Sequence, residues 1–278
     1  MSTGNSLTQK LENLNKLLLD LEKVVIAFSG GVDSTFLAAA AWRVLGDKAV
    51  ALTACSETFP QREKEEAASL AALIGIKHVF VEASELNNED FKENGPERCY
   101  YCKKERYGIL LKWVVEHGFN WLIEGSNADD LEDYRPGLKS LAEMDKVKSP
   151  LLEIGLTKDD IRKISKDWGL PTWEKPSAAC LSSRLAYGLY VTPERLAQVE
   201  KAEEIVRKYC QGQVRVRHHG SIARIEVEPK NIPLVAANHH AIWSKIKELG
   251  FTFVALDLHG YGTGTMNLEL GKLATQEK

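Results

Sequence analysis

Short apolar runs that alternate with helical stretches organise the first 126 residues of this 278-residue chain. The runs are rich in β-branched and small apolar residues and lack polar alternation, which is typical of parallel strands covered on both faces. The runs span 23–31, 49–56, 77–83 and 120–126, and the helical stretches span 34–46, 61–75 and 100–117. An amphipathic helix precedes them, with Leu7, Leu11, Leu14, Leu18 and Leu21 on one face. The sequence therefore predicts a doubly wound α/β fold, whose ligands bind beyond the carboxyl ends of the strands.

The pattern changes after the stretch PTWEKPSAACLSSRLAYGLYVTP, which begins at Pro171. The elements predicted beyond it are a helix at 193–209, strands at 213–219 and 222–228, a helix at 231–248 and a strand at 251–258. The sequence His-His-Gly-Ser between the first two strands predicts a tight hairpin. We therefore predict an α/β domain over residues 1–185 and a small α+β domain over 186–278, which serves the substrate or oligomerisation.

The composition is that of an ordinary globular chain, with 44% apolar and 27% charged residues. The N-terminus carries no charged-then-apolar leader pattern, and no apolar run approaches the roughly 18 residues that a membrane span requires. We expect a cytoplasmic protein with no membrane partner. A net charge of −3 argues against nucleic acid as the main partner, because neutralising phosphates needs a concentrated basic surface.

Five cysteines are present, and two of them form the sequence Cys99-Tyr-Tyr-Cys102. An odd and sparse set, in a compartment that keeps thiols reduced, argues against a structural disulfide. The pair is then half of a zinc site, a redox dithiol or part of a centre that needs a third cysteine, and its spacing leaves these open. Cys55 and Cys210 are expected to pack as small hydrophobic side chains.

The strongest local motif is Ser29-Gly30-Gly31-Val32-Asp33-Ser34, where the first apolar run turns into its helix. In such a turn, backbone N–H groups and the positive helix end face an anion, and glycines let the backbone approach phosphate oxygens. The hydroxyls of Ser29 and Ser34 add donors, and Asp33 can hold a Mg²⁺ ion that bridges phosphates. The Gly-Lys-Ser/Thr ending of a Walker A loop does not occur in it, so transfer of a γ-phosphate is not indicated.

This motif resembles the pyrophosphate loop, or PP loop, of the ATP pyrophosphatases, which cleave ATP between its α- and β-phosphates and adenylate a substrate oxygen. Two further stretches are EGSNADDLEDYRPGLKS, from Glu124, and KPSAACLSSRLAYG, from Lys175. With the C-terminal stretches VRVRHH and IARIEV, they resemble the LarE family of ATP-dependent sulfur transferases, which build the thiocarboxylates of the nickel-pincer nucleotide cofactor. The resemblance covers residues 20–265.

The resemblance implies roles for individual residues. Those expected to bind ATP, Mg²⁺ or the substrate are Ser29, Gly30, Gly31, Asp33, Ser34, Asp129 or Asp130, Arg135, Arg215 and Arg217. Cys180 matches the sulfur-donating cysteine of the family, and Asp33 and Arg184 are expected to act in catalysis with it. The arginine pair matches one that reaches phosphate at a subunit interface, so a homo-oligomer is expected.

Some of these residues also have a plainer interpretation. Arg215 and Arg217 alternate with Val214 and Val216 on one predicted strand, which is the pattern of a solvated strand face. The acidic residues after the fourth apolar run are of a type that often only forms turns.

The sulfur source is where this chain departs from the sacrificial form of the family, in which one cysteine gives up its sulfur and becomes dehydroalanine. Here Cys99 and Cys102 accompany Cys180, and the three thiolates converge beside the ATP site if the segment after residue 175 folds back over the sheet edge. Three thiolates suit a [4Fe–4S] cluster with one open iron, whereas structural zinc normally has four protein ligands. We expect such a cluster, with external sulfide or another sulfur donor, and sacrifice of Cys180 as the alternative.

The resemblance implies adenylation of a carboxylate of pyridinium-3,5-dicarboxylate mononucleotide, with release of pyrophosphate, and then sulfur insertion. Two other activities of the same superfamily compete with this one. A tRNA thiolase would need a basic RNA-binding module, of which this acidic chain shows no sign. An amide-forming synthetase of the NAD synthetase kind would leave three cysteines without a role.

Overall fold

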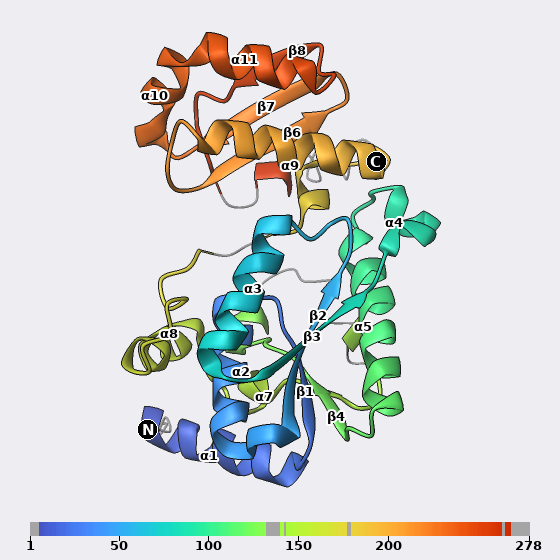
Figure 1. The fold of residues 1–278 in the computed structure, drawn as a ribbon, viewed down its shortest axis with the longest axis vertical. Coiled ribbons are helices and arrows are strands. Elements are labelled where there is room, and N and C mark those ends of the chain that lie inside the picture. The colour runs from blue at the N-terminus through green and yellow to red at the C-terminus, as the bar shows by residue number, and fades with distance from the viewer. Residues whose placement is uncertain (1–5, 132–139, 142, 177–178, 263–264, 268–278) are drawn as a thin grey trace, which may run out of the picture. The chain divides into compact units, whose positions relative to one another are not determined.

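The computed structural model of the protein describes residues 6–131, 140–141, 143–176, 179–262 and 265–267 (Figure 1). Two compact units are present. The N-terminal unit holds Met1–Glu85 and Cys99–Ala178, and the C-terminal unit holds Leu86–Arg98 and Ala179–Lys278. The domain boundary predicted between residues 185 and 186 stays a prediction.

A parallel sheet forms the centre of the N-terminal unit, with the described strands in the order β3-β2-β1-β4-β5. They are β1 (Val24–Ala27), β2 (Ala49–Cys55), β3 (Lys77–Glu82), β4 (Trp121–Ile123) and β5 (Val147–Lys148). Val25 of β1 lies opposite Val50 on one side and Leu122 on the other. Because the chain winds outward from β1 in both directions, the edge between β1 and β4 is the switch point at which such sheets bind ligands.

Helices cover both faces of this sheet (Figure 1). The helices are α1 (Leu7–Leu21), α2 (Val32–Leu45), α3 (Gln61–Ile74) and α8 (Lys158–Asp167) on one face and α5 (Arg98–Glu116) on the other. Side chains of β1 alternate between the faces, so Ile26 packs with the first set while Val25 packs with Leu110 of α5. The predicted doubly wound α/β fold is confirmed.

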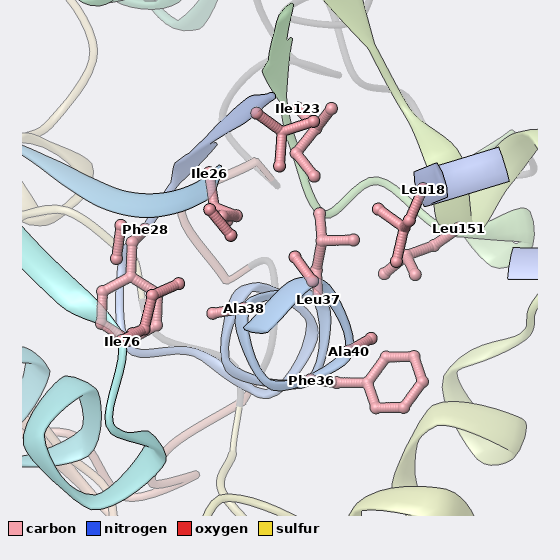
Figure 2. Close-up of a cluster of buried hydrophobic side chains, with 14 of the residues drawn as sticks. Leu18, Ile26, Phe28, Phe36, Leu37, Ala38, Ala40, Ile76, Ile123 and Leu151 are labelled. Carbon is pink, nitrogen blue, oxygen red and sulfur yellow. The ribbon is translucent and has the colours of Figure 1, made fainter. Parts of the chain in front are cut away.

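Helix α2 is buried along most of its length. Its alanines at 38–41 let neighbouring elements approach closely, and Figure 2 shows Leu37 on the side of α2 that faces Ile26 and Ile123. The ring of Phe36 packs against Trp168, which follows α8, with 5.2 Å between ring centroids. Packing on both sides therefore fixes the helix that begins directly after the PP loop.

The structure has elements between residues 147 and 167 that the apolar pattern did not predict. They are β5, the short helix α7 (Pro150–Glu153) and α8. Strand β5 is too short to show a pattern. Helix α8 buries only Ile161, Ile164 and Ser165, but the capping box of Thr157 and Asp160 marks its start and is a signal that the sequence carries.

The C-terminal unit follows the predicted order of helices and strands. Its elements are α9 (Pro193–Arg207), β6 (Val214–His219), β7 (Ile222–Val227), α10 (Ile232–Ala237), α11 (His239–Glu248) and β8 (Phe253–Leu256). β6 and β7 form the predicted hairpin, with Gly220 in the left-handed region at a φ of 70°, and β8 runs parallel to β7.

The helix predicted at 231–248 is two helices, because Asn238 interrupts it. Asn238 leaves helical geometry, and its side-chain amide donates to the carbonyl of Leu234 at 2.8 Å. Asparagine competes for backbone hydrogen bonds in this way, so it favours helix ends over helix interiors. Across the described residues, no helix has the length and hydrophobicity of a bilayer-spanning segment.

His218 makes folding stability depend on pH. It is 3% exposed, its Nε2 lies 3.0 Å from Gln198 Oε1, and its Nδ1 has no hydrogen-bond partner among the residues that the structure describes. Burial, and then the charge of Arg195, lowers its pKa from 6.5 to about 4. Because the unfolded chain binds this proton more tightly, the contribution of His218 to stability is complete above 6.5 and is lost as pH falls towards 4.

We predict that His218→Gln reduces the loss of stability on acidification. The measurement is the free energy of unfolding in urea at about pH 7 and about pH 4.5, for both proteins. The decrease between the two pH values should be smaller in the variant than in the wild type. Equal decreases would show that the burial of His218 does not cause the loss of stability on acidification.

Candidate active site

The PP loop joins β1 to α2 at the switch point of the sheet. Gly30 has a φ of 69°, in the left-handed region, and a Cβ atom there would lie 3.3 Å from Ala67 Cα of α3. Gly31 is the N-cap of α2, and it has no side chain with which to cap the first N–H groups of the helix. The loop therefore leaves backbone donors at the start of α2, where the sequence analysis expects an anion.

Two serine hydroxyls shape this loop. The Oγ atoms of Ser29 and Ser34 lie 3.1 Å apart, and the backbone N–H of Ser29 donates to Ser34 Oγ at 3.3 Å. Ser29 Oγ also accepts from the N–H of Gly31 at 3.4 Å. Both predicted hydroxyls are thus held at the start of α2, where they can turn to phosphate oxygens.

A pocket of about 250 Å³ lies beside the loop. Its walls include the loop and helix residues Ser29, Gly31, Asp33 and Ser34, and the apolar residues Ala27, Phe28, Leu52, Ala54, Phe59 and Leu110. An apolar wall beside an anion-binding loop suits a nucleotide, whose base prefers apolar surroundings and whose phosphates need donors.

Asp33 is held by groups from two later segments of the chain. Lys158 Nζ forms an ion pair with its Oδ2, and Asn127 Nδ2 lies 3.4 Å from its Oδ1. The backbone N–H of Lys158 donates to Asp129 Oδ2 at 3.0 Å. The structure thus brings together two predicted residues, Asp33 and Asp129, through a lysine that the sequence analysis did not identify.

The end of β4 adds carboxylates to the same pocket. Glu124 and Asp130 are buried and line it, and Glu124 Oε2 accepts from the hydroxyl of Ser126 at 2.8 Å. Lys103 and Arg106 of α5 line the pocket as well. The polar part of the pocket therefore contains both charge signs, which suits a magnesium nucleotide and an anionic second substrate.

Cys99 and Cys102 lie in the first turns of α5. Because they are three residues apart, they lie on the same side of the helix. Cys102 Sγ lies 3.4 Å from Oε1 of the buried Glu85, which Arg106 Nε also approaches, at 2.9 Å. Two thiols one helical turn apart could serve as two ligands of a metal centre. Within the described parts of the chain, no three His, Cys, Asp or Glu residues are grouped to hold a metal ion.

Cys180, the third cysteine of interest, belongs to the C-terminal unit and precedes the 3₁₀ turn η4 (Leu181–Arg184). Its Sγ lies 3.0 Å from Ser182 Oγ, and its carbonyl accepts from Arg184 Nη1 at 2.6 Å. Arg184 is 2% exposed and also donates to Glu203 Oε1 at 3.0 Å. Burial raises the pKa of Glu203, but the charge of Arg184 lowers it overall, so a buried ion pair fixes the backbone that carries Cys180.

A second arginine binds the same loop. Arg98 donates from Nη1 to the carbonyl of Ser182 at 2.9 Å, and also to Asn94 Oδ1. Arg98 directly precedes Cys99 in the chain, and Ser182 lies two residues after Cys180. Arg98 and Ser182 both belong to the C-terminal unit, so this hydrogen bond holds the loop of Cys180 within that unit.

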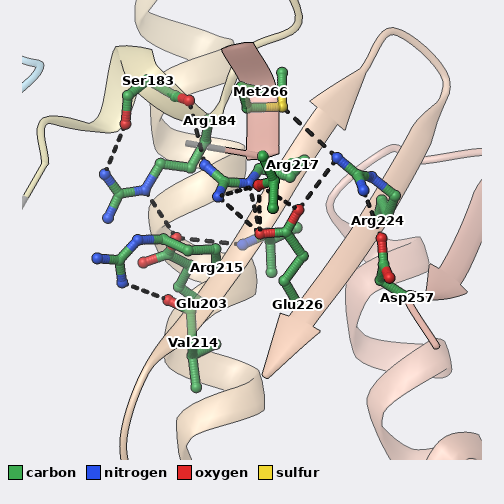
Figure 3. A network of polar contacts seen from close by, with 12 residues as sticks. Ser183, Arg184, Glu203, Val214, Arg215, Arg217, Arg224, Glu226, Asp257 and Met266 are labelled. Carbon is green, nitrogen blue, oxygen red and sulfur yellow. Dashed lines mark hydrogen bonds and ion pairs between the residues drawn. The ribbon is translucent and has the colours of Figure 1, made fainter. Parts of the chain in front are cut away.

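Arg215 and Arg217 lie in a buried network of charges on the sheet of the C-terminal unit (Figure 3). Each is only 6% exposed, so the interpretation as a solvated strand face is wrong. Arg217 Nη2 pairs with Glu226 Oε2 at 2.7 Å, and Figure 3 shows Arg224 meeting the same carboxylate. Burial, and then the charge of Arg184, lowers the pKa of Arg215 to about 10.

Comparisons with known proteins agree with this geometry. The family model of the PP-loop domain matches residues 4–135. An uncharacterized protein of Synechocystis sp. is 41% identical over 96% of this chain and 100% of its own length. The pyridinium-3,5-bisthiocarboxylic acid mononucleotide synthase of Lactiplantibacillus plantarum is 37% identical over 96% of this chain and 97% of its own. This chain belongs to the LarE family.

As a member of the LarE family, the chain is an ATP-dependent sulfurtransferase. A more distant likeness reaches other PP-loop enzymes. A subunit of the glutamine-hydrolysing GMP synthase of Archaeoglobus fulgidus is 29% identical over 67% of this chain and 64% of its own length. The pocket beside the PP loop is therefore the place to look for the ATP of this LarE-family enzyme.

The structure places most of the predicted site residues in two groups. Ser29, Gly30, Gly31, Asp33 and Ser34 form the loop, Asp129 lies beside it, and Arg184, Arg215 and Arg217 lie together in the C-terminal unit. Arg135 lies outside the described residues. The roles given to all of them stay predictions, because they rest on the family resemblance.

Several residues of the LarE-family site were missed by sequence reasoning. Lys158 holds Asp33, and Lys175 donates to the carbonyl of Gly30 at 2.9 Å while pairing with Glu66 at 3.0 Å. The capping box before α8 could have placed Lys158 at the start of a helix. It could not have shown that the lysine side chain reaches Asp33. The others are brought to the loop by tertiary packing alone.

Gly125 allows the end of β4 to lie against the PP loop. A Cβ atom there would lie 3.1 Å from the backbone nitrogen of Ser34 and 3.1 Å from Asp33 Cβ. We predict that Gly125→Ala displaces the start of α2 and weakens ATP binding about tenfold or more, because charged hydrogen bonds to phosphate lengthen. Calorimetric titration with ATP gives the Kd of the variant and of the wild type.

The matched control is Gly108→Ala, because among the described residues no atom outside the neighbouring backbone of its own helix lies within 4 Å of a Cβ atom there. Alanine suits a helix interior better than glycine, so this variant should fold at least as well and bind ATP as the wild type does. ATP binding by Gly125→Ala that equals the wild type would contradict the close approach.

Proposed function

We propose that this enzyme adenylates a carboxylate of pyridinium-3,5-dicarboxylate mononucleotide with ATP and inserts sulfur to form the thiocarboxylate of the nickel-pincer nucleotide cofactor. The PP loop at the switch point of the sheet carries the proposal, together with the relative from Lactiplantibacillus plantarum, whose name gives a bisthiocarboxylic acid mononucleotide as its product. We place the reaction in the cytoplasm, where thiols stay reduced.

The groups around the pocket suit the adenylation step. A substrate carboxylate oxygen attacks the α-phosphorus of ATP, and the bond to the bridging oxygen breaks as pyrophosphate leaves with its electron pair. Loop N–H groups and the hydroxyls of Ser29 and Ser34 stabilise the charge on the leaving phosphates. Sulfide then attacks the acyl carbonyl, AMP leaves, and a thiocarboxylate remains.

Charge in the C-terminal unit supports binding of a nucleotide phosphate. The guanidinium groups of the network belong to Arg184, Arg207, Arg215, Arg217 and Arg224, and its carboxylates to Glu203, Glu226 and Asp257. Among these described residues positive charge is in excess, and a phosphate would balance it. That the phosphate binds between subunits of a homo-oligomer remains part of the proposal.

We further propose that sulfur is supplied with the help of a [4Fe–4S] cluster held by Cys99, Cys102 and Cys180. Two of these thiols share one helix end, and Arg184 and Arg98 hold the loop of the third within the C-terminal unit. When bound by three thiolates, such a cluster keeps one iron open for an additional sulfide.

Adenylation is tested by the release of pyrophosphate and AMP. We predict that wild-type enzyme releases both from ATP only when the mononucleotide is present, and that Asp33→Ala abolishes adenylation and sulfur transfer because the loop loses its metal-binding carboxylate. The control is Asp159→Ala, which removes an exposed carboxylate of α8. Substantial release by Asp33→Ala, or release that depends on bulk tRNA instead of the mononucleotide, would contradict the proposal.

The cluster is tested on protein prepared without air. We predict broad absorption near about 400 nm and about four irons per chain, as a [4Fe–4S] cluster requires, and more than one turnover with external sulfide. Replacement of Cys99, Cys102 or Cys180 by alanine should remove the iron, while Cys55→Ala and Cys210→Ala should keep it. If the protein stays colourless and loses the mass of H₂S at Cys180 after a single turnover, the sacrificial route holds instead.

A further inference from the structure

Lys158, the partner of Asp33, stands at a firmly anchored helix start. It is the first residue of α8, after the N-cap Thr157, and the capping box joins Thr157 and Asp160 in both directions at 3.2 and 3.3 Å. Asp160 also pairs with Lys10 of α1 at 2.7 Å. The backbone of Lys158 is therefore fixed on more than one side.

Packing fixes the same helix relative to α2, which carries Asp33. Ile161 and Ile164 of α8 are buried in the core that surrounds α2, and Trp168 stacks on Phe36. The guanidinium of Arg43 lies over the Trp168 ring, 3.8 Å from its centroid. The ion pair between Lys158 and Asp33 thus joins the starts of two helices that cannot easily move apart.

Lys158 and Mg²⁺ need the same carboxylate. Lys158 Nζ is bonded to Asp33 Oδ2, and Asn127 approaches Oδ1. A Mg²⁺ ion binds a carboxylate oxygen at about 2.0–2.1 Å and accepts little distortion. An ammonium group on the same carboxylate would then lie about 4 Å from a doubly charged ion, and the two cations would repel each other strongly.

We propose that Lys158 is a positioning residue that competes with Mg²⁺ for Asp33. While ATP is absent, the ammonium group neutralises Asp33 and keeps it aimed along the PP loop. With Mg²⁺ and ATP bound, Asp33 would hold the metal, and Lys158 would turn to the phosphates and add positive charge beside the leaving pyrophosphate. This inference rests on the proposed ATP site and adds a residue to it.

The test compares ATP affinity with and without the metal. Calorimetric titration gives the Kd of ATP in excess Mg²⁺ and in EDTA, and the ratio of the two is the Mg²⁺ enhancement. In Lys158→Met, we expect this enhancement to rise about tenfold, because the metal no longer displaces an ammonium group from Asp33. A merely structural role would weaken both affinities in proportion and leave the enhancement unchanged, which would overturn the inference.

Two further variants separate competition from misfolding. Lys158→Arg keeps the positive charge and should stay near the wild-type enhancement. Lys163→Met removes an exposed lysine of the same helix, paired with Asp159, and should not change the enhancement. An increase in Lys163→Met that matched the increase in Lys158→Met would overturn the inference.

The effect must also depend on the shared carboxylate. In an Asp33→Asn background, Lys158→Met should no longer raise the enhancement, because the group for which both cations compete is gone. A rise that persists there would overturn the inference. If the wild type binds no ATP in either buffer, the proposed function itself fails, which distinguishes the two failures.

Discussion

The burial of helix α2 is the constraint on which the N-terminal unit depends. A PP loop is not stable by itself, because its first N–H groups have no partner within the helix and its glycines lose much backbone freedom on folding. Tertiary contacts of α2, whose small side chains let β1, β4 and α8 approach together, offset these costs. The close approach of Gly125 to Ser34 and the reach of Lys158 to Asp33 both follow from that packing.

Much of this fold could be predicted from the sequence because its signals are local. The strands of the sheet lack polar alternation, and the leucines of α1 mark one helix face, so both were found. Strand β5 could not be found, since two residues paired with β4 carry no pattern. Asn238 broke a predicted helix through a side-chain hydrogen bond that competes with the backbone.

The candidate site also has a part that the sequence displays and a part that only the folded chain creates. The loop from Ser29 to Ser34 is contiguous, so the sequence displays it as a motif. The partner of its one charged residue is distant in sequence, because Lys158 lies 125 residues from Asp33. In the pocket wall, Arg106 likewise pairs with Glu85, 21 residues away. Periodicity and spacing hold no information about such pairs, which packing creates. The burial of Arg215 and Arg217 could not be predicted from the residues alone, because strand alternation does not reveal what covers a polar face.

The charged residues of the C-terminal unit serve placement more than stability. A buried ion pair such as Arg184 with Glu203 loses hydration on folding, so its net contribution to stability is small compared with apolar packing of the same volume. Its geometry, however, is strict, because an arginine left without its acceptors in the interior is costly. Arg184 therefore admits few conformations of the backbone at Cys180, and Arg98 restricts the same loop at Ser182. The role that we propose for Cys180 in sulfur delivery benefits from such restriction, since alternatives to the productive position are removed before the substrate arrives.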